Sequence, residues 1–110
     1  MLEALWTAEF SSNLGIFGAG VVVFETGRLF GGDSQYYYLG TCEVKNEVLE
    51  ADIEVTHFAG QGFSLFGGLK KFHLKAEGKI KEPKMEISGY LKENPDLKIY
   101  IQLTRRAELP

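Results

Sequence analysis

Hydrophobic and polar residues alternate along much of the chain, which is the pattern of β-strands that bury one face. The alternation is clearest in residues 48–56, where one face is apolar and the other acidic or polar. Residues 71–81, 85–91 and 97–103 alternate in the same way. Residues 2–11 also fit a helical period, but we prefer a strand there because every second residue is apolar.

Clusters of turn-forming residues separate eight such stretches and predict hairpins between them. In Gly31-Gly32-Asp33-Ser34, we expect Gly32 to supply a positive φ and the two polar side chains to bond their own backbone. Asn94-Pro95-Asp96 predicts the last turn. Closing an eight-stranded meander removes its exposed edges. We therefore predict an all-β fold, an eight-stranded antiparallel up-and-down barrel of lipocalin-like form, with residues 1–110 as one domain.

The alternation also predicts which side chains lie inside and outside the barrel. The predicted interior consists of Trp6, Phe10, Ile53, Val55, Phe72, Leu74, Ile99 and Ile101. Residues 21–24 are apolar on both faces, which one barrel wall cannot bury, so we expect a homodimer joined through the outer face of the N-terminal strands. The pattern leaves open which parity of residues 21–24 faces outward. The candidate dimer face is Leu5, Val22, Phe24, Tyr37 and Leu39.

Charge and cysteine content exclude several classes of function. Fifteen acidic and 12 basic residues give a formal charge of −3, so the chain lacks the basic field of a nucleic-acid-binding protein. Cys42 is the single cysteine, which excludes an internal disulfide and favours a reducing compartment. An acid, Glu3, stands where a signal peptide has bases, and no apolar run reaches the roughly 18 residues of a membrane span. We expect a cytoplasmic protein without membrane contact.

Residues that could carry catalysis or bind a cofactor are few. Cys42, His57 and His73 are the soft metal-ligand candidates, and strand parity places His73 on the opposite side of the sheet from the other two. The histidines have no nucleophile and orienting acid at a motif spacing. The glycines of residues 15–20 are followed by β-branched residues rather than by a helix, which argues against dinucleotide binding. We expect no metal, no cofactor and no enzymatic activity.

Residues 59–69 form the longest predicted loop and the one that carries large apolar side chains, namely Phe63, Leu65, Phe66 and Leu69. Four glycines make this loop pliable, while its aromatic residues would be costly to leave in water. We expect a lid over one end of the barrel. The lid either plugs the barrel or gates an interior pocket or a partner site.

Several motifs together resemble one known family. They are Gly31-Gly32-Asp33 ahead of the three tyrosines 36–38, Leu5-Trp6-Thr7, Ser12-Asn13-Leu14-Gly15, residues 20–24 and residues 103–110. The chain resembles the GrlR family, negative regulators of type III secretion, over nearly its whole length. The resemblance implies a β-barrel without a catalytic centre that binds and silences a helix-turn-helix transcription activator.

The resemblance also suggests where a partner protein binds. In the GrlR family an acidic run follows the Tyr-x-Gly strand, and in this chain Lys45 and Asn46 interrupt that run. The candidate partner-binding residues are Glu43, Glu47, Glu50, Asp52 and Glu54. The first functional hypothesis is thus a GrlR-like regulator that acts by protein–protein binding. The alternative is a lipocalin-like carrier or sensor, because an eight-stranded barrel is wide enough to hold one small hydrophobic ligand.

Overall fold

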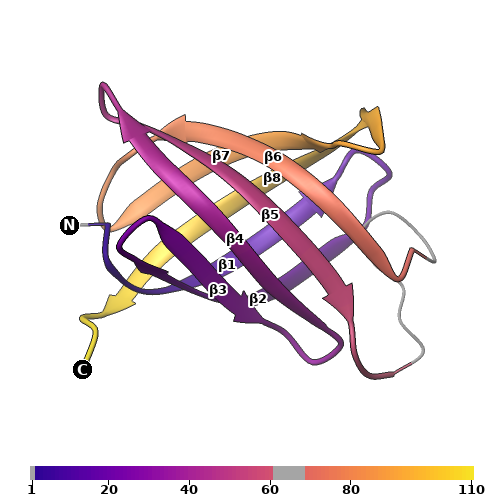
Figure 1. Cartoon of the computed structure of the whole chain (residues 1–110), viewed down its shortest axis with the longest axis horizontal. Coiled ribbons are helices and arrows are strands. Elements are labelled where there is room, and N and C mark those ends of the chain that lie inside the picture. Colours follow the sequence, from indigo (N-terminus) through magenta and orange to yellow (C-terminus); the bar gives the residue numbers. More distant parts are fainter. Residues whose placement is uncertain (1, 61–68) are drawn as a thin grey trace.

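Eight β-strands account for most of the chain that the computed structural model describes, which is residues 2–60 and 69–110. The strands are β1 (Ala4–Ser12), β2 (Phe17–Glu25), β3 (Arg28–Gly32), β4 (Tyr36–Lys45), β5 (Val48–His57), β6 (Lys71–Lys79), β7 (Lys84–Leu91) and β8 (Asn94–Ala107). Figure 1 shows them wrapped obliquely around one interior, with both chain ends at the same end of the barrel.

Each strand pairs antiparallel with the next one along the chain, and β8 returns to pair with β1. The closing pair places Thr7 opposite Thr104, and Arg106 Nε donates a hydrogen bond to Thr7 Oγ1 at 2.9 Å. The predicted all-β, eight-stranded antiparallel up-and-down barrel is thereby confirmed. The segment at residues 2–11 forms a strand from Ala4 onward rather than a helix.

The barrel interior is apolar, as the alternation along the strands predicts. All eight predicted interior residues face it, six of them buried, while Phe10 and Ile53 are partly buried against the core. Trp6 is fully buried, meets the ring of Phe24 edge to face at 6.2 Å and donates its indole N–H to the Leu2 carbonyl at 2.9 Å. Burial of such a side chain stabilises the fold by about 1.5–3 kcal/mol before ordering entropy is subtracted.

The predicted dimer face is wrong for two residues of β2. Val22 and Phe24 point into the barrel, with 8% and 2% of their surface exposed, while Val21 is 41% exposed and Val23 is half-buried. The sheet register explains this parity, since Phe24 lies opposite the buried Leu29. The outward residues of the apolar run are therefore Val21 and Val23.

The hairpin between β3 and β4 is confirmed, but Gly32 does not supply a positive φ. Among the described residues the glycines with positive φ are Gly15, Gly27 and Gly60, and Gly32 instead ends β3. The turn is instead held by the carboxylate of Asp33, which accepts hydrogen bonds from backbone N–H groups of the turn.

The turn between β7 and β8 lies earlier than predicted. Leu91 pairs directly with Asn94, so the chain turns at Lys92 and Glu93, and Asn94-Pro95-Asp96 already belongs to β8. Proline is tolerated near the start of a strand because it lacks only a donor there. A carboxylate oxygen of Glu93 accepts a hydrogen bond from the backbone N–H of His73 at 3.0 Å, which ties the turn to β6.

Candidate functional site

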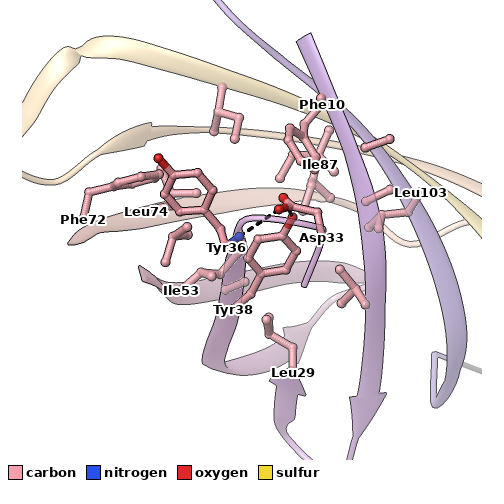
Figure 2. Close-up of a pocket in the computed structure, with 18 of the residues that line it drawn as sticks. Phe10, Leu29, Asp33, Tyr36, Tyr38, Ile53, Phe72, Leu74, Ile87 and Leu103 are labelled. Carbon is pink, nitrogen blue, oxygen red and sulfur yellow. Dashed lines mark hydrogen bonds between the residues drawn. The ribbon is translucent and has the colours of Figure 1, made fainter. Parts of the chain in front are cut away.

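A cavity of about 320 Å³ occupies one end of the barrel interior. Every strand contributes to its lining, and most of the lining side chains are apolar. Its outer rim is formed by Ile16 from the β1–β2 connection, Phe17 at the start of β2 and residues 33–35 from the β3–β4 turn. Figure 2 shows side chains such as Phe10, Leu29 and Phe72 arranged around this space.

The interior is hollow at one end because small side chains face it there. Ala8 and Ala51 line the cavity, so the space that a larger residue would fill stays open. Near the starts of β1, β5 and β7, Trp6, Leu49 and Met85 are completely buried and do not line the cavity. The barrel is therefore filled at one end and able to hold a small molecule at the other.

The polar part of the lining lies in and beside the β3–β4 turn. Asp33 Oδ1 accepts hydrogen bonds from the backbone N–H groups of Gln35 at 2.8 Å and Tyr36 at 2.9 Å, while the Tyr38 hydroxyl donates to Asp33 Oδ2. Figure 2 shows both the turn contact and the tyrosine contact of this carboxylate. Burial raises the pKa of Tyr38 far above its usual value, and the hydrogen bond to Asp33 raises it further. Tyr38 therefore remains a protonated donor at neutral pH.

Two glycines of β2 make room for the aromatic side chains at this end. A Cβ atom on Gly20 would lie 2.7 Å from the Tyr38 hydroxyl oxygen, and one on Gly18 would lie 2.5 Å from the ring of Phe10. The rings of Phe10 and Tyr38 meet edge to face, with centroids 6.3 Å apart. The absence of side chains at Gly18 and Gly20 thus leaves room for the Phe10 ring and for the Tyr38 hydroxyl.

Three of the predicted lid residues, Phe63, Leu65 and Phe66, lie outside the described residues. Leu69 is described and is 40% exposed. Its neighbour on the chain, Lys70, accepts a hydrogen bond at its carbonyl oxygen from the His57 N–H at 2.8 Å. The lid stays a prediction.

The predicted partner-binding acids fall into two groups, and the first is paired within the chain. Asp52 contacts Lys92 at 2.5 Å and Lys75 at 3.7 Å, and the hydrogen bond from Lys92 is the largest cause of the lowered pKa of Asp52. Glu54 contacts Lys71 at 3.5 Å and His73 at 3.3 Å. These contacts follow from the β5–β6 register, which sets an acidic stripe beside a basic one.

The second group faces other acids. Glu43 lies directly opposite Glu50, and Glu50 lies directly opposite Glu77, so three carboxylates form one row across β4, β5 and β6. Like charges in such positions repel each other. Lys45 reaches Glu43 at 3.4 Å, and Glu47 stands apart in the exposed β4–β5 turn. We call Glu43, Glu50 and Glu77 the glutamate row.

The outer face of β1–β4 carries an apolar surface that contains the rest of the predicted dimer face. Leu5, Val23, Phe30 and Leu39 lie opposite one another in register across these four strands. Phe30 is 36% and Leu39 52% exposed. Beside this row lie Val21 and Tyr37, and the Tyr37 ring lies 6.2 Å from that of Phe58. We call the six residues Leu5, Val21, Val23, Phe30, Tyr37 and Leu39 the apolar wall.

The soft metal-ligand candidates are not brought together. Cys42 is buried, and burial followed by the charge of Glu3 raises the pKa of its thiol. His57 Nε2 lies 3.1 Å from the Gly60 carbonyl oxygen, and His73 lies on the outer face. Within residues 2–60 and 69–110, no group of three or more His, Cys, Asp and Glu side chains could hold a metal ion.

The sequence reasoning did not single out the pairing of Asp33 with Tyr38. Its signal is an acid three residues before a run of tyrosines, in a turn that opens onto the inward parity of β4. The sequence identified Asp33 as a turn residue and Tyr38 as part of the tyrosine run, but it did not indicate that the two side chains meet.

Comparisons with known proteins support the fold alone. No family model matches the chain, and no curated protein matches it. Among solved structures, the chain is similar to a redesigned β-barrel, with 14% identity and a TM-score of 0.66 over 96% of this chain and 91% of that one. No helix in the described part of the chain is long and apolar enough to cross a membrane.

Proposed function

We propose that this protein binds a small, mostly apolar molecule inside the barrel. The observation that carries the proposal is the cavity of about 320 Å³ at the end formed by the β1–β2 and β3–β4 connections. Its volume lies at the lower end of the roughly 300–1,000 Å³ that is usual for small-molecule sites.

The lining has the composition of such a site. The lining combines apolar side chains from all eight strands with a few polar groups gathered at the rim. In such a site, burial of apolar surface gives affinity and hydrogen bonds fix the orientation of the ligand. A ligand that transfers apolar surface into this space gains about 25 cal/mol per Å² buried. The proposal needs no bond-making chemistry, in line with a carrier or sensor.

Filling the cavity tests this proposal. Ala51 is buried and lines the cavity, so Ala51→Leu should occupy ligand space and weaken binding of 1-octanol by about tenfold or more, a change of about 1.4 kcal/mol. Titration calorimetry measures the affinity, and circular dichroism checks that the variant is folded. Val23→Leu adds bulk on the outer face and should leave affinity unchanged. An affinity for 1-octanol that is equal in the wild type and in Ala51→Leu contradicts the proposal.

A second candidate function is regulation by protein–protein binding, as the resemblance to the GrlR family implies. The chain offers two surfaces for protein binding, the apolar wall and the glutamate row, and an exposed apolar patch is typical of an interaction surface. We assign the apolar wall to a second copy of this chain, because a row that lies in register across four strands can meet its own copy in an isologous contact. This second candidate function includes a cytoplasmic location for the protein.

The glutamate row offers a place for a basic partner such as a transcription activator. Among the described residues, Glu43 of this row contacts Lys45, so a cationic partner would relieve chiefly the repulsion between Glu50 and Glu77. Asp52 and Glu54 already contact lysines within the chain. Glu50→Lys should then release a purified basic activator domain that the wild type retains, whereas Asp52→Lys should have the smaller effect. Equal retention by the wild type and Glu50→Lys in a pull-down counts against this assignment.

A further inference from the structure

Asp33 is the one charged residue among the described residues that line the cavity. In the part of the chain that the structure describes, no lysine, arginine or histidine forms an ion pair with it, although several surface acids have such partners. Asp33 is half-buried at the rim, next to the apolar side chains that line the cavity. A charge in that position lacks an opposite charge, and low-dielectric surroundings strengthen its attraction for a cation.

The hydrogen bonds of Asp33 leave capacity for a ligand. An ionised carboxylate offers about four acceptor positions on its two oxygens. Oδ1 accepts two backbone N–H groups of the turn, and Oδ2 accepts the Tyr38 hydroxyl. The remaining acceptor position is on Oδ2, the oxygen that faces Tyr38 inside the cavity lining (Figure 2).

We propose that the ligand of this cavity is a small apolar molecule with a positively charged amine head group, which donates to Asp33 Oδ2 while its hydrocarbon part lies along the inner wall. This inference rests on the proposed ligand-binding function and names the ligand class. The charged head gains a charge-assisted hydrogen bond, which is roughly twice as strong as a neutral one. The Tyr36 and Tyr38 rings also line the cavity and supply apolar surface for the hydrocarbon part of the ligand.

The same geometry disfavours carboxylate ligands such as fatty acids. Such an anion would meet the charge of Asp33 and would find no cationic side chain among the described lining residues. Residues 61–68, which lie outside the described residues, include no Lys, Arg or His in their sequence. Desolvation of an anion in this cavity would therefore not be compensated by a partner.

Three ligands with the same hydrocarbon chain test the head-group preference. Octylamine, 1-octanol and octanoate are titrated into the wild-type protein by calorimetry at neutral pH. We expect octylamine to bind about tenfold or more tightly than octanoate, with 1-octanol between them. Octanoate binding as tightly as octylamine overturns the amine assignment and leaves the proposed cavity function standing. Failure of all three ligands to bind overturns both.

A conservative variant tests the residue. Asp33→Asn keeps an oxygen that can accept the turn N–H groups of Gln35 and Tyr36 but removes the charge. It should weaken octylamine binding by about tenfold while changing 1-octanol binding by less than about twofold. Glu86→Gln removes the same charge from the outer face of β7 and serves as the matched control. Octylamine affinity that falls no further in Asp33→Asn than in Glu86→Gln overturns the role of Asp33, and the wild-type comparison tests the ligand class even if the variant does not fold.

Discussion

The outer face of β1–β4 and the outer face of β5–β8 differ in the side chains that they expose. The first carries the apolar wall, with Phe30 and Leu39 facing outward. The second carries charges that pair across neighbouring strands, such as Asp52 with Lys75 and Glu54 with His73. Both halves bury the same kind of apolar interior, so the difference lies wholly in the residues that face away from it.

This difference indicates which half of the barrel is available for contact. An antiparallel sheet with one face on the core and one in water shows hydrophobic-in, polar-out alternation, and β5 and β6 follow this rule. β1–β4 depart from it, although an outward valine or phenylalanine adds little to the stability of a lone barrel. The departure is understandable if the apolar wall is covered by another copy of the chain.

The largest expected effect is the difference in unfolding free energy between substitutions on the inner and outer faces of β2. Phe24→Lys would place a charge in the interior and remove a packed ring, and should lower the free energy of unfolding by at least about 4 kcal/mol. Val23→Lys, one residue earlier, faces outward and should change the unfolding free energy of the monomer by less than about 1 kcal/mol. Urea denaturation followed by circular dichroism compares them. Equal losses would mean that the assigned parity of β2 is wrong.

An intermediate effect is expected at the apolar wall. Phe30→Lys and Leu39→Lys should each shift a homodimer toward monomers, with the dissociation constant rising by about a hundredfold, because each places a charge in an apolar contact. Light scattering over a concentration series measures this shift. Gln102→Lys on the outer face of β8 is the matched control and should leave the oligomeric state unchanged. A wild type that stays monomeric at high concentration removes the dimer proposal.

The smallest effect concerns the pH dependence of the charged face. The hydrogen bond that His73 Nδ1–H donates to the Glu93 carboxylate is the main cause of the raised pKa of His73, and the contact with the Glu54 carboxylate raises this pKa further. A histidine whose pKa is raised on folding stabilises the folded state fully below its unfolded pKa of about 6.5, and this contribution is lost as pH rises through the higher folded value. Because the side chain is 42% exposed, the contribution should stay below about 1 kcal/mol.

The measurement is a difference between two proteins. The unfolding free energy of the wild type minus that of His73→Gln should be larger at pH 5.5 than at pH 9, and high salt should reduce it. A difference that is the same at both pH values would show that Glu93 and Glu54 do not stabilise the charged imidazole.

The sequence predicted the barrel because its strands alternate, and it predicted best where the alternation is cleanest. In β5, Ala51 and Val55 could be placed inward from the pattern alone, and both are buried. In β2 the pattern could not decide, because residues 21–24 are apolar at both parities, and the parity follows from the register with β3. The β7–β8 turn was predicted at residues 94–96 but lies at Lys92 and Glu93. Glu93 contacts His73 on β6, and a contact between strands cannot be read from the local sequence.

The candidate site was harder to predict for a physical reason. A cavity is the difference between the space that eight strands enclose and the volume of the side chains that fill it, so no single residue signals it. Asp33 was recognised through its turn chemistry, which is local. Its contact with Tyr38 depends on the missing side chain of Gly20, on another strand, which allows the hydroxyl to lie where Asp33 can accept from it.

The pairing of β8 with β1 determines when the barrel can be completed during synthesis. Thr7 and Arg106 are in contact although they lie 99 positions apart in the sequence. One side of β1 therefore stays unpaired until β8 has been synthesised. Such long-range pairing is slow, and a strand with one unpaired side can associate with other chains meanwhile. Truncation within residues 94–107 should therefore produce an aggregating product rather than a smaller folded one, because every earlier strand depends on the last strand to close the cylinder.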